Sequence, residues 1–488
     1  MLYHSTRSQT HIADSAQAVL AGLAPDGGLY VPAQLPSLDV AACLQEDTKA
    51  MAARIIGAML PDIPNMAQLV DQAYTGKFAT EELTPTVQAG PFRVLELFHG
   101  PTSAFKDVAL CMLPQLLTAA RKEKGMVEPI LILTATSGDT GKAALAGFQD
   151  VEGVNICVFY PQGGVSKVQR AQMVTQEGNN VAVCAVEGNF DDAQSGVKRI
   201  FSDLEIRETL AQRGSFLSSA NSINWGRILP QVVYYISAYC DLLRDGEIQM
   251  GDKVNFCVPT GNFGDILAGY YAKSMGLPVN KLICASNSND VLTDFLRVGL
   301  YNRNRPFYTT MSPSMDILIS SNLERLVFDL CGRDDREVRR YMDSLNQKGV
   351  YEVTDDVKTG IQEAFWAGFC SEKATTETIA DYYKNKGYLI DTHTAVAVNV
   401  LEQYRTTTKD ETLTVFLSTA SPYKFCNHVL SAIGETPAGD GVELLDQLNA
   451  VSGVEVPRRL SGLKGKERRF DLTAEKQEME QVVLNFLQ

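Results

Sequence analysis

Residues 129–141 have the sequence PILILTATSGDTG, in which a short apolar run passes through a glycine-bearing turn into an alanine-rich segment. The apolar run is rich in β-forming residues, and the segment after the turn has helical character. Similar short apolar runs follow at Val154–Tyr160, Asn180–Val186, Ser215–Ala220, Lys253–Val258, Lys281–Ala285 and Glu411–Ser418. Segments of helix length separate these runs. Unbroken apolar strands that alternate with helices predict an α/β fold, with parallel sheets covered on both faces.

The pattern divides the chain into four parts. Residues 1–92 are predicted to form a mixed N-terminal cap, with a turn at Pro25–Gly28 and a helix over Thr48–Leu60. We expect a smaller α/β domain over 93–215, a larger one over 216–440 and a C-terminal tail over 441–488. Within the larger domain, residues 299–326 have the composition of a loop and residues 334–386 are expected to be mainly helical. A basic cluster in the tail is interpreted as a solvated surface segment rather than a binding patch.

Composition excludes several classes of protein. The chain has 488 residues, is 45% hydrophobic and carries 44 basic against 58 acidic side chains, a net charge of −14. This acidic balance argues against binding to nucleic acid or to an anionic membrane, because both need a positive surface. No apolar run approaches the ~18 residues that cross a bilayer, and the start of the chain lacks the pattern of a signal peptide. Ten scattered cysteines without a CxxC pair fit a reducing cytosol, so we expect a cytoplasmic protein.

No metal site is expected. The five histidines are dispersed, and none has the spacing to an acidic residue or to another histidine that zinc enzymes use.

Two turns have the composition of anion-binding loops. Residues 134–141 (TATSGDTG) and 258–265 (VPTGNFGD) each join a predicted strand to a predicted helix. Amide groups at such a helix N-terminus favour a phosphate or a carboxylate, and glycine lets the anion approach the backbone closely. The alternative is an ordinary helix cap or tight turn. The second loop has neither the Lys-Ser/Thr of a P-loop nor the glycine spacing of a dinucleotide fingerprint, so neither ATP nor NAD is indicated.

Three further segments carry candidate functional side chains. Residues 97–107 (LFHGPTSAFKD) place Lys106 just before a long apolar helix, where a partly buried amine would lose its proton readily and react with an aldehyde. Residues 219–227 (SANSINWGR) place Arg227 beside amide and hydroxyl donors that suit a phosphate. Thr419 follows a predicted strand, at the edge where open α/β sheets bind ligands. An exposed lysine, a surface arginine and a capping threonine are the respective alternatives.

Taken together, these segments resemble the threonine synthase family, pyridoxal-phosphate enzymes of fold type II (tryptophan-synthase-β-like). LFHGPTSAFKD is similar to the family's Schiff-base motif, TATSGDTG to its substrate-carboxylate loop and PTGNFGD to its cofactor-phosphate loop. The segments GLAPDGGLYVP and SANSINWGR are also similar to family segments. The resemblance spans roughly residues 1–435.

The resemblance implies roles for individual residues. Lys106 would bind pyridoxal phosphate and act as the catalytic base. The cofactor-binding residues would be Lys106, Gly261, Asn262, Phe263, Gly264, Asp265, Asp139 and Thr419, with Thr419 facing the pyridine nitrogen. The residues that bind the substrate, O-phospho-L-homoserine, would be Ser137, Gly138, Thr140, Asn221, Ser222 and Arg227. Some branches of the family have asparagine where this chain has Asp139, and a carboxylate beside the cofactor's ring hydroxyl would be repelled unless one of the two groups is protonated.

The implied reaction converts O-phospho-L-homoserine and water to L-threonine and phosphate, the last step of threonine biosynthesis. A threonine-synthase-like phospho-lyase, which releases 2-oxobutyrate, ammonia and phosphate, is the alternative within the family. A non-catalytic metabolite-binding protein on the same fold is the alternative from another class, and it predicts a missing lysine or a degraded phosphate loop, whereas both are present. We expect a monomer or a homodimer.

Overall fold

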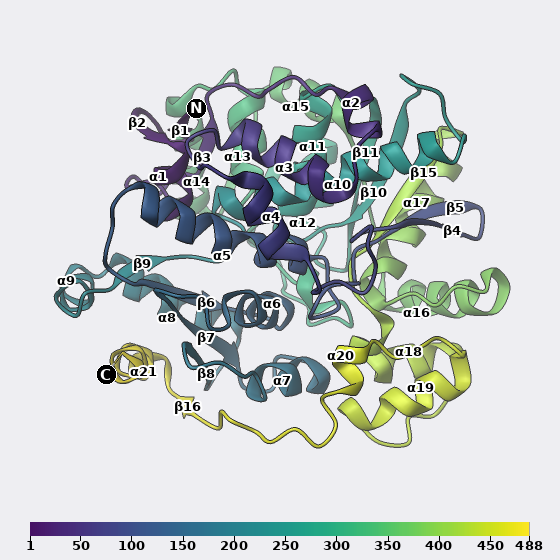
Figure 1. Cartoon of the computed structure of the whole chain (residues 1–488). Coiled ribbons are helices and arrows are strands. Elements are labelled where there is room, and N and C mark those ends of the chain that lie inside the picture. Colours follow the sequence, from purple (N-terminus) through teal and green to yellow (C-terminus); the bar gives the residue numbers. More distant parts are fainter. Residues whose placement is uncertain (488) are drawn as a thin grey trace.

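The computed structural model describes residues 1–487, apart from the side chains of residues 191 and 202, and its strands form two main sheets (Figure 1). The smaller sheet is parallel throughout, with the order β16-β8-β7-β6-β9. Its strands are β6 (Ile130–Ala135), β7 (Val154–Pro161), β8 (Val181–Val186), β9 (Phe216–Ser218) and β16 (Thr473–Ala474). Its helices are α5 (Lys106–Glu123), α6 (Asp139–Phe148), α7 (Lys167–Val174), α8 (Phe190–Ser202) and α9 (Leu204–Gln212).

The larger sheet has the order β14-β11-β10-β15-β5-β4 and is parallel except at its β4 edge. Its strands are β4 (Thr86–Ala89), β5 (Phe92–Glu96), β10 (Val254–Pro259), β11 (Val279–Ser286), β14 (Phe365–Phe369) and β15 (Thr414–Ser418). The helices around it are α10 (Trp225–Arg244), α11 (Gly264–Ser274), α12 (Val291–Val298), α13 (Leu323–Leu330), α14 (Asp335–Lys348), α15 (Asp355–Ala364), α16 (Glu372–Asp381), α17 (Thr392–Thr408) and α18 (Cys426–Ile433). Helices α5 and α10 pack against each other and so join the helical layers of the two sheets.

Both sheets are buried on both faces, as the apolar strands predict. Along β6, Ile130 and Ile132 belong to the main hydrophobic core, whereas Leu131 and Leu133 belong to a separate core on the other face. Strand β10 alternates in the same way between two cores. Successive side chains of a strand point to opposite faces, so a strand buried on both faces needs apolar residues at every position.

The N-terminal segment packs against α10 of the larger domain and against α5 of the smaller one. It contains the three-stranded sheet β2-β1-β3 and four helices. These elements are β1 (Leu2–Ser5), β2 (Ser8–Asp14), β3 (Tyr30–Pro32), α1 (Ser15–Ala21), α2 (Val40–Leu44), α3 (Thr48–Met59) and α4 (Met66–Tyr74). Arg7 forms an ion pair of 2.7 Å with the buried Glu324 of α13, which ties this segment to the larger domain.

The C-terminal segment crosses from one domain to the other. It contains α19 (Leu444–Ser452), α20 (Arg458–Ser461), strand β16 and α21 (Met479–Phe486). In Figure 1 it runs in yellow along the bottom of the molecule, from α20 beside the larger domain to β16 and α21 beside the smaller sheet. Thr473 and Ala474 pair with Ala185 and Val186 and so cover the β8 edge. Part of the basic cluster holds this segment in place, because Arg469 donates to the carbonyls of Gln176 (2.7 Å) and Gly178 (3.0 Å).

The sheets differ in detail from the predicted elements. Strands β4, β5, β12 (Leu300–Asn302), β13 (Val350–Glu352) and β14 were not predicted from the sequence. Strand β5 lies in the larger sheet although four of its five residues fall within the smaller domain as predicted (93–215), and β9 lies in the smaller sheet although it falls within the larger domain as predicted (216–440). These strands are three to five residues long, too short for a reliable period, and their places depend on pairing with distant strands.

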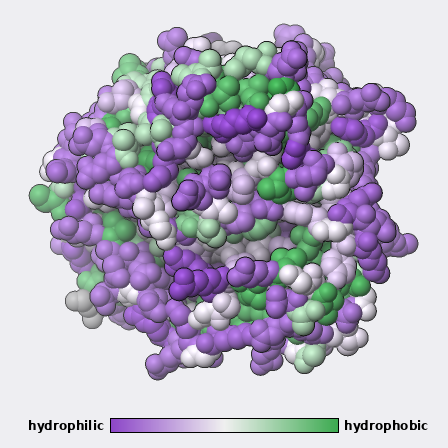
Figure 2. Space-filling view, turned by 45° about the vertical axis from the view of Figure 1, so that its right-hand side comes forward, coloured by the Kyte–Doolittle hydropathy of each residue, from purple (hydrophilic) through white to green (hydrophobic). Residues whose placement is uncertain are grey.

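The face in Figure 2 is mostly hydrophilic, and its hydrophobic residues form small separate groups. Within residues 1–487, no helix is long and apolar enough to cross a membrane.

Candidate active site

The candidate side chains come together where four parallel strands end. The turns after β6, β9, β10 and β15 carry the loop 136–141, the segment 219–227, the loop 260–265 and Thr419, respectively. A hydrogen bond of 3.5 Å from Arg227 to the Thr140 hydroxyl joins the first two segments. A methyl group built on Gly264 would lie 3.4 Å from Cβ of Ser222, so the second and third segments also touch. Ligand sites at the carboxyl ends of parallel strands are typical of open α/β sheets.

Lys106 is the first residue of α5 and is buried, with 9% of its surface exposed. Burial lowers the pKa of its amino group to about 8; Asp139 opposes this shift, whereas Arg227 and Lys424 add to it. Roughly a tenth of the amine is therefore unprotonated at pH 7, far more than for an ordinary lysine, which suits a nucleophile toward an aldehyde and a proton acceptor.

The loop that precedes Lys106 is fixed to the end of β15. The amide of Phe105 donates to the carbonyl of Thr419 (2.8 Å), and the amide of Ser421 donates to the carbonyl of Ser103 (3.0 Å). These backbone bonds bring Thr419, which is 4% exposed, beside the lysine. Asp107 orients the same loop from within, because its carboxylate accepts hydrogen bonds from the amide (2.8 Å) and hydroxyl (2.6 Å) of Thr102.

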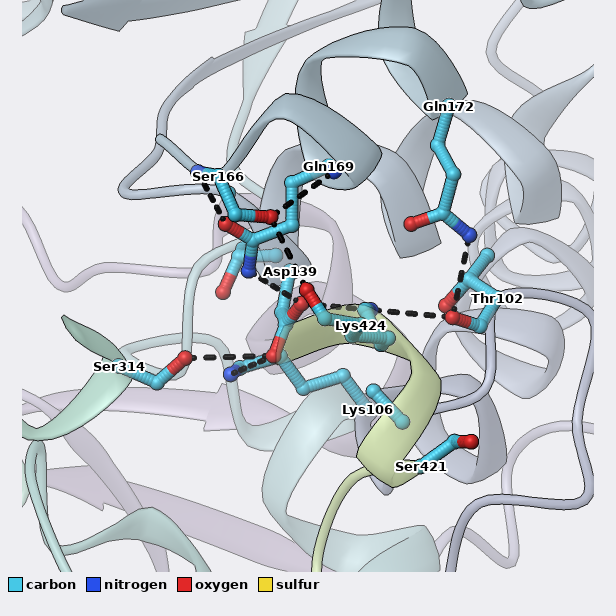
Figure 3. Close-up of polar contacts among 12 residues, drawn as sticks. Thr102, Lys106, Asp139, Ser166, Gln169, Gln172, Ser314, Ser421 and Lys424 are labelled. Carbon is cyan, nitrogen blue, oxygen red and sulfur yellow. Dashed lines mark hydrogen bonds and ion pairs between the residues drawn. The ribbon is translucent and has the colours of Figure 1, made fainter. Parts of the chain in front are cut away.

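Asp139 is the first residue of α6 and is buried among cations and hydrogen-bond donors (Figure 3). Lys424 lies 2.6 Å from its Oδ1, and the Lys106 amino group lies 3.9 Å from its Oδ2. Gln169 donates to Oδ1 (2.7 Å) and the Ser314 hydroxyl to Oδ2 (3.3 Å). Burial alone would raise the pKa of Asp139, but Lys424 and Lys106 outweigh it and hold the pKa well below its usual range. The carboxylate is therefore ionised.

The start of α6 is open to an anion. Gly138, which precedes α6 with φ +131°, has no side chain that could cap the helix. A methyl group at Gly138 would lie 2.5 Å from the Gln169 side chain, so this position needs glycine. The Thr136 hydroxyl accepts hydrogen bonds from the amides of Gly138 (2.9 Å) and Gly141 (2.8 Å) and fixes the shape of the loop. Ser137 and Thr140 are half-buried at the same turn.

The start of α11 is the second open helix end. Phe263 precedes it in the left-handed conformation (φ 62°) and provides no side-chain cap. A methyl group on Gly261 would lie 2.7 Å from the carbonyl oxygen of Ser314, so only glycine fits there. Ser320 donates to the Gly261 carbonyl (3.0 Å) and Asn322 to the Asn262 carbonyl (3.1 Å). These contacts turn the carbonyls away from the helix end and leave its amides available.

Asp265, in the first turn of α11, has neutral partners only. The hydroxyls of Tyr234 (2.5 Å) and Tyr235 (2.8 Å) both donate to its Oδ1. Its Oδ2 is buried and has no hydrogen-bond partner among residues 1–487. Burial raises the pKa of Asp265 to about 6, although the two tyrosine hydroxyls and Lys106 oppose the shift.

Arg227, in the first turn of α10, is a buried cation without an anionic partner in the part of the chain that the structure describes. Its guanidinium donates to the Ala220 carbonyl (2.7 Å) and to the Thr140 hydroxyl. Burial lowers the pKa of Arg227 to about 10. Asn221 and Ser222 are half-buried next to it. A buried guanidinium without a counter-ion is well suited to bind the phosphate of a ligand.

The structure thus brings together the predicted residues of all five segments, and it adds side chains that sequence reasoning missed. Lys424 lies five residues after Thr419 but gave no signal of its own. Gln169 lies on α7, and Ser314 lies in the segment 299–326, which was predicted to be a loop. Tyr234 and Tyr235 belong to the apolar helix α10. Among the described residues, no cluster of three or more histidine, cysteine, aspartate or glutamate side chains could hold a metal ion.

Three family descriptions match the chain in order. Residues 2–74 match "Threonine synthase N terminus", residues 80–356 match "Pyridoxal-phosphate dependent enzyme" and residues 394–483 match "Threonine synthase, C-terminal".

Individual proteins give the same result. The chain is 41% identical over 450 residues to a threonine synthase of Pseudomonas aeruginosa, covering 90% of this chain and 92% of that protein. It is 40% identical over 440 residues to human threonine synthase-like 1, which covers 86% of this chain but only 58% of the human protein. The crystal structure of pyridoxal-phosphate-bound threonine synthase from Brucella melitensis superposes with a TM-score of 0.88 at 38% identity, covering 100% of both chains.

Proposed function

Because the chain belongs to the threonine synthase family of pyridoxal-phosphate-dependent enzymes, we propose that it converts O-phospho-L-homoserine and water to L-threonine and phosphate. Family membership gives the cofactor and the lyase class, and the geometry of the site supports the substrate. The single observation that carries the proposal is Arg227, a buried cation that lacks an anionic partner in the described chain. It lies beside the start of α6, where its guanidinium contacts the Thr140 hydroxyl.

The residues present fit pyridoxal phosphate. We assign its aldehyde to Lys106, its phosphate to the amides of residues 261–264 at the start of α11, and its ring nitrogen to the neutral hydroxyl of Thr419. When bound, the cofactor withdraws electrons from the substrate's α-carbon and so makes the proton on that carbon acidic. The fit rests on a buried amine of lowered pKa and on an open helix start where a side chain at Gly261 would clash.

The substrate has two anionic ends, and the site has two separate places for them. The open start of α6, with Ser137, Gly138 and Thr140, is assigned to the carboxylate of the amino acid. Arg227, with Asn221 and Ser222, is assigned to the phosphate. The hydrogen bond between Arg227 and Thr140 brings these two places together, as a short phosphorylated amino acid requires.

Lys106 is proposed as the group that moves protons. Its amine is buried and its pKa is lowered to about 8, close to neutral pH, so it can accept a proton and return it without a large energetic cost. The second buried amine of the site, that of Lys424, is held by Asp139 and by the Thr102 carbonyl (3.0 Å). Lys106 is therefore the amine available for proton transfer.

A phospho-lyase that releases 2-oxobutyrate, ammonia and phosphate is the second candidate. It is favoured by one finding, namely that proteins described as threonine synthase-like 1 are as similar to this chain as the threonine synthases are. The two reactions share cofactor, substrate and phosphate release, and differ in whether water adds to the substrate's β-carbon.

Product analysis distinguishes the two reactions. Purified protein loaded with pyridoxal phosphate is mixed with O-phospho-L-homoserine, and phosphate, threonine and 2-oxobutyrate are measured over time. Threonine formed in step with phosphate is the expected result. Phosphate with 2-oxobutyrate and no threonine would establish the lyase, and no phosphate release would refute both. A Lys106→Ala protein serves as the inactive control.

A further inference from the structure

Lys424 is a completely buried lysine that no assigned role explains. It lies in the short helix η3 (Pro422–Phe425), which follows β15 and Thr419, and none of its surface is exposed. Lysine is among the residues that are least often fully buried, and it is buried almost only when it is paired. Its amino group contacts Asp139 Oδ1 (2.6 Å) and the carbonyl of Thr102 (3.0 Å).

The ion pair of Lys424 with Asp139 crosses between the two domains. Asp139 begins a helix of the smaller sheet, whereas Lys424 follows the fourth strand of the larger sheet. A second contact accompanies the ion pair, because the Ser166 hydroxyl donates to the Lys424 carbonyl (3.2 Å). Ser166 in turn caps α7, the helix that presents Gln169 to Asp139. Figure 3 shows Asp139 at the centre of this arrangement, with the amino groups of Lys106 and Lys424 both pointing toward its carboxylate.

The two lysines differ as counter-ions. Lys106 is 3.9 Å from the carboxylate, and its amine is the group that we assign to the cofactor's aldehyde. Lys424 is nearer, at 2.6 Å, and is not assigned to the cofactor, so its contact with Asp139 does not depend on what happens to Lys106. A buried carboxylate without a permanent cation would be costly to keep ionised.

We propose that Lys424 is a positioning residue that compensates the negative charge of Asp139 and thereby fixes Asp139 next to the amine of Lys106. An asparagine at position 139 would carry no charge and would need no such compensation. Lys424 is therefore required because residue 139 is an aspartate. This inference rests on the proposed role of Lys106, but it does not depend on which product is formed.

The test is a set of three variants, Lys424→Met, Asp139→Asn and the double variant Asp139→Asn/Lys424→Met. Methionine keeps much of the length and volume of lysine but has no charge. Lys142→Met is the matched control, because Lys142 is another largely buried lysine, on α6, whose amino group donates to the neutral Gln176 rather than to Asp139.

The first measurement follows the uptake of pyridoxal phosphate by cofactor-free protein, by visible absorbance, as a function of pH. Uptake needs the unprotonated amine of Lys106, so its midpoint in the unaltered protein is expected at about pH 8. In Lys424→Met the midpoint should rise for two reasons. A cation that lowers the pKa of Lys106 is lost, and Lys106 becomes the remaining cation in contact with the Asp139 carboxylate in the described chain. In the double variant the midpoint should return toward the original value, and in Lys142→Met it should not move.

The second measurement is turnover of the loaded enzyme. We expect kcat of Lys424→Met to fall about 100-fold with little change in KM, as for a displaced catalytic group. The kcat of the double variant should be about 10-fold higher than that of Lys424→Met, since the two residues act as a pair. If Lys424→Met fails to fold and the double variant folds, the coupling is shown directly.

Three outcomes would overturn the proposal: an unchanged uptake midpoint and kcat in Lys424→Met, losses in the double variant that equal the product of the two single losses, or failure of both Lys424→Met and the double variant to fold. The last would mean that Lys424 acts through Thr102 instead. Uptake of the cofactor does not use the substrate, so a wrong assignment of the reaction leaves this test intact.

Discussion

The starts of α6 and α11 are built alike, yet their electrostatics are opposite. Each helix follows a parallel strand, is preceded by a residue of positive φ that does not cap it with a side chain, and has an aspartate in its first turn. Asp139 lies among cations and is ionised, whereas Asp265 lies between two tyrosine hydroxyls and has a pKa raised to about 6. The same local motif therefore gives a permanent anion at the start of α6 and, at the start of α11, a carboxyl group that takes up a proton near pH 6.

The difference comes from residues remote in sequence. Lys424 and Ser314 reach Asp139 from other segments, and Tyr234 and Tyr235 reach Asp265 from α10. A carboxylate beside the uncapped start of α11 would compete with a bound phosphate for the helix amides, so a protonatable Asp265 suits that position.

Removal of Lys106, the cation near both aspartates, should have the largest effect. For Lys106→Ala we expect turnover to fall at least ~1,000-fold, because the variant loses both the amine that reacts with the cofactor and the proton acceptor. The visible band of bound cofactor should also be lost. Lys122→Ala, an exposed lysine on the same helix, is the control and should behave like the unaltered protein. Retention of both band and activity in Lys106→Ala would refute the assignment.

Asp139→Asn should destabilise the cofactor-free protein by about 3 kcal/mol at pH 7.5, because Lys424 is left buried without its counter-ion. The folded-state pKa of Asp139 is depressed, so its contribution to stability is present above the unfolded pKa near 3.8 and is lost as the pH falls below it. The difference in Tm between variant and unaltered protein should therefore shrink at acidic pH. A difference that does not depend on pH would argue against an ionised Asp139.

Asp265→Asn should stabilise the cofactor-free protein, whereas Asp139→Asn should destabilise it. The folded-state pKa is raised from 3.8 to about 6, so the folded protein binds more protons between these values and loses stability as the pH rises through them. Above pH 6 this costs about 3 kcal/mol, at 1.36 kcal/mol per pKa unit. The variant should thus have a higher Tm than the unaltered cofactor-free protein at pH 8 and an equal one near pH 4. Asp343→Asn, an exposed aspartate on α14, controls for loss of charge alone.

Arg227→Met gives the smallest expected change. It tests the segment 219–227, which touches the start of α6 through Arg227 and the start of α11 through Ser222. Loss of a charged hydrogen bond of about 1.5–3 kcal/mol should raise KM for O-phospho-L-homoserine roughly 10- to 150-fold. The Tm of the protein without ligands should not fall, because the lost charge has no counter-ion in the described chain. A large drop in Tm with unchanged KM would make Arg227 a structural residue.

Much of this comparison was predictable from the sequence, but its electrostatics were not. Strand-to-helix turns dense in glycine identify both helix starts, because their signal lies within eight residues. Lys106 and Arg227 were found through the segments that contain them. Lys424 could not be found in this way, since its importance depends on a carboxylate nearly three hundred residues away in the chain, roughly the length of a large domain.

The same limit applies to the fold. Strands β6, β7, β10 and β11 were predicted because their apolar runs are almost unbroken, as burial of both faces of a strand requires. Strands β5 and β14 escaped prediction because five residues do not establish a period. The two sheets also exchange short segments at the predicted boundary, and pairing of that kind is set by contacts distant in sequence.

The pairing of β16 with β8 has a consequence for biosynthesis. A ribosome makes β6, β7, β8 and β9 long before residues 473–474, so the nascent smaller sheet has an open edge at β8 during most of translation. Open edges of parallel sheets are sites where other chains can add a strand and aggregate. The segment that crosses from α20 to β16 thus covers the β8 edge only after it has been synthesised. Newly made protein in which β16 has not yet paired with β8 is the form that should depend most on chaperones.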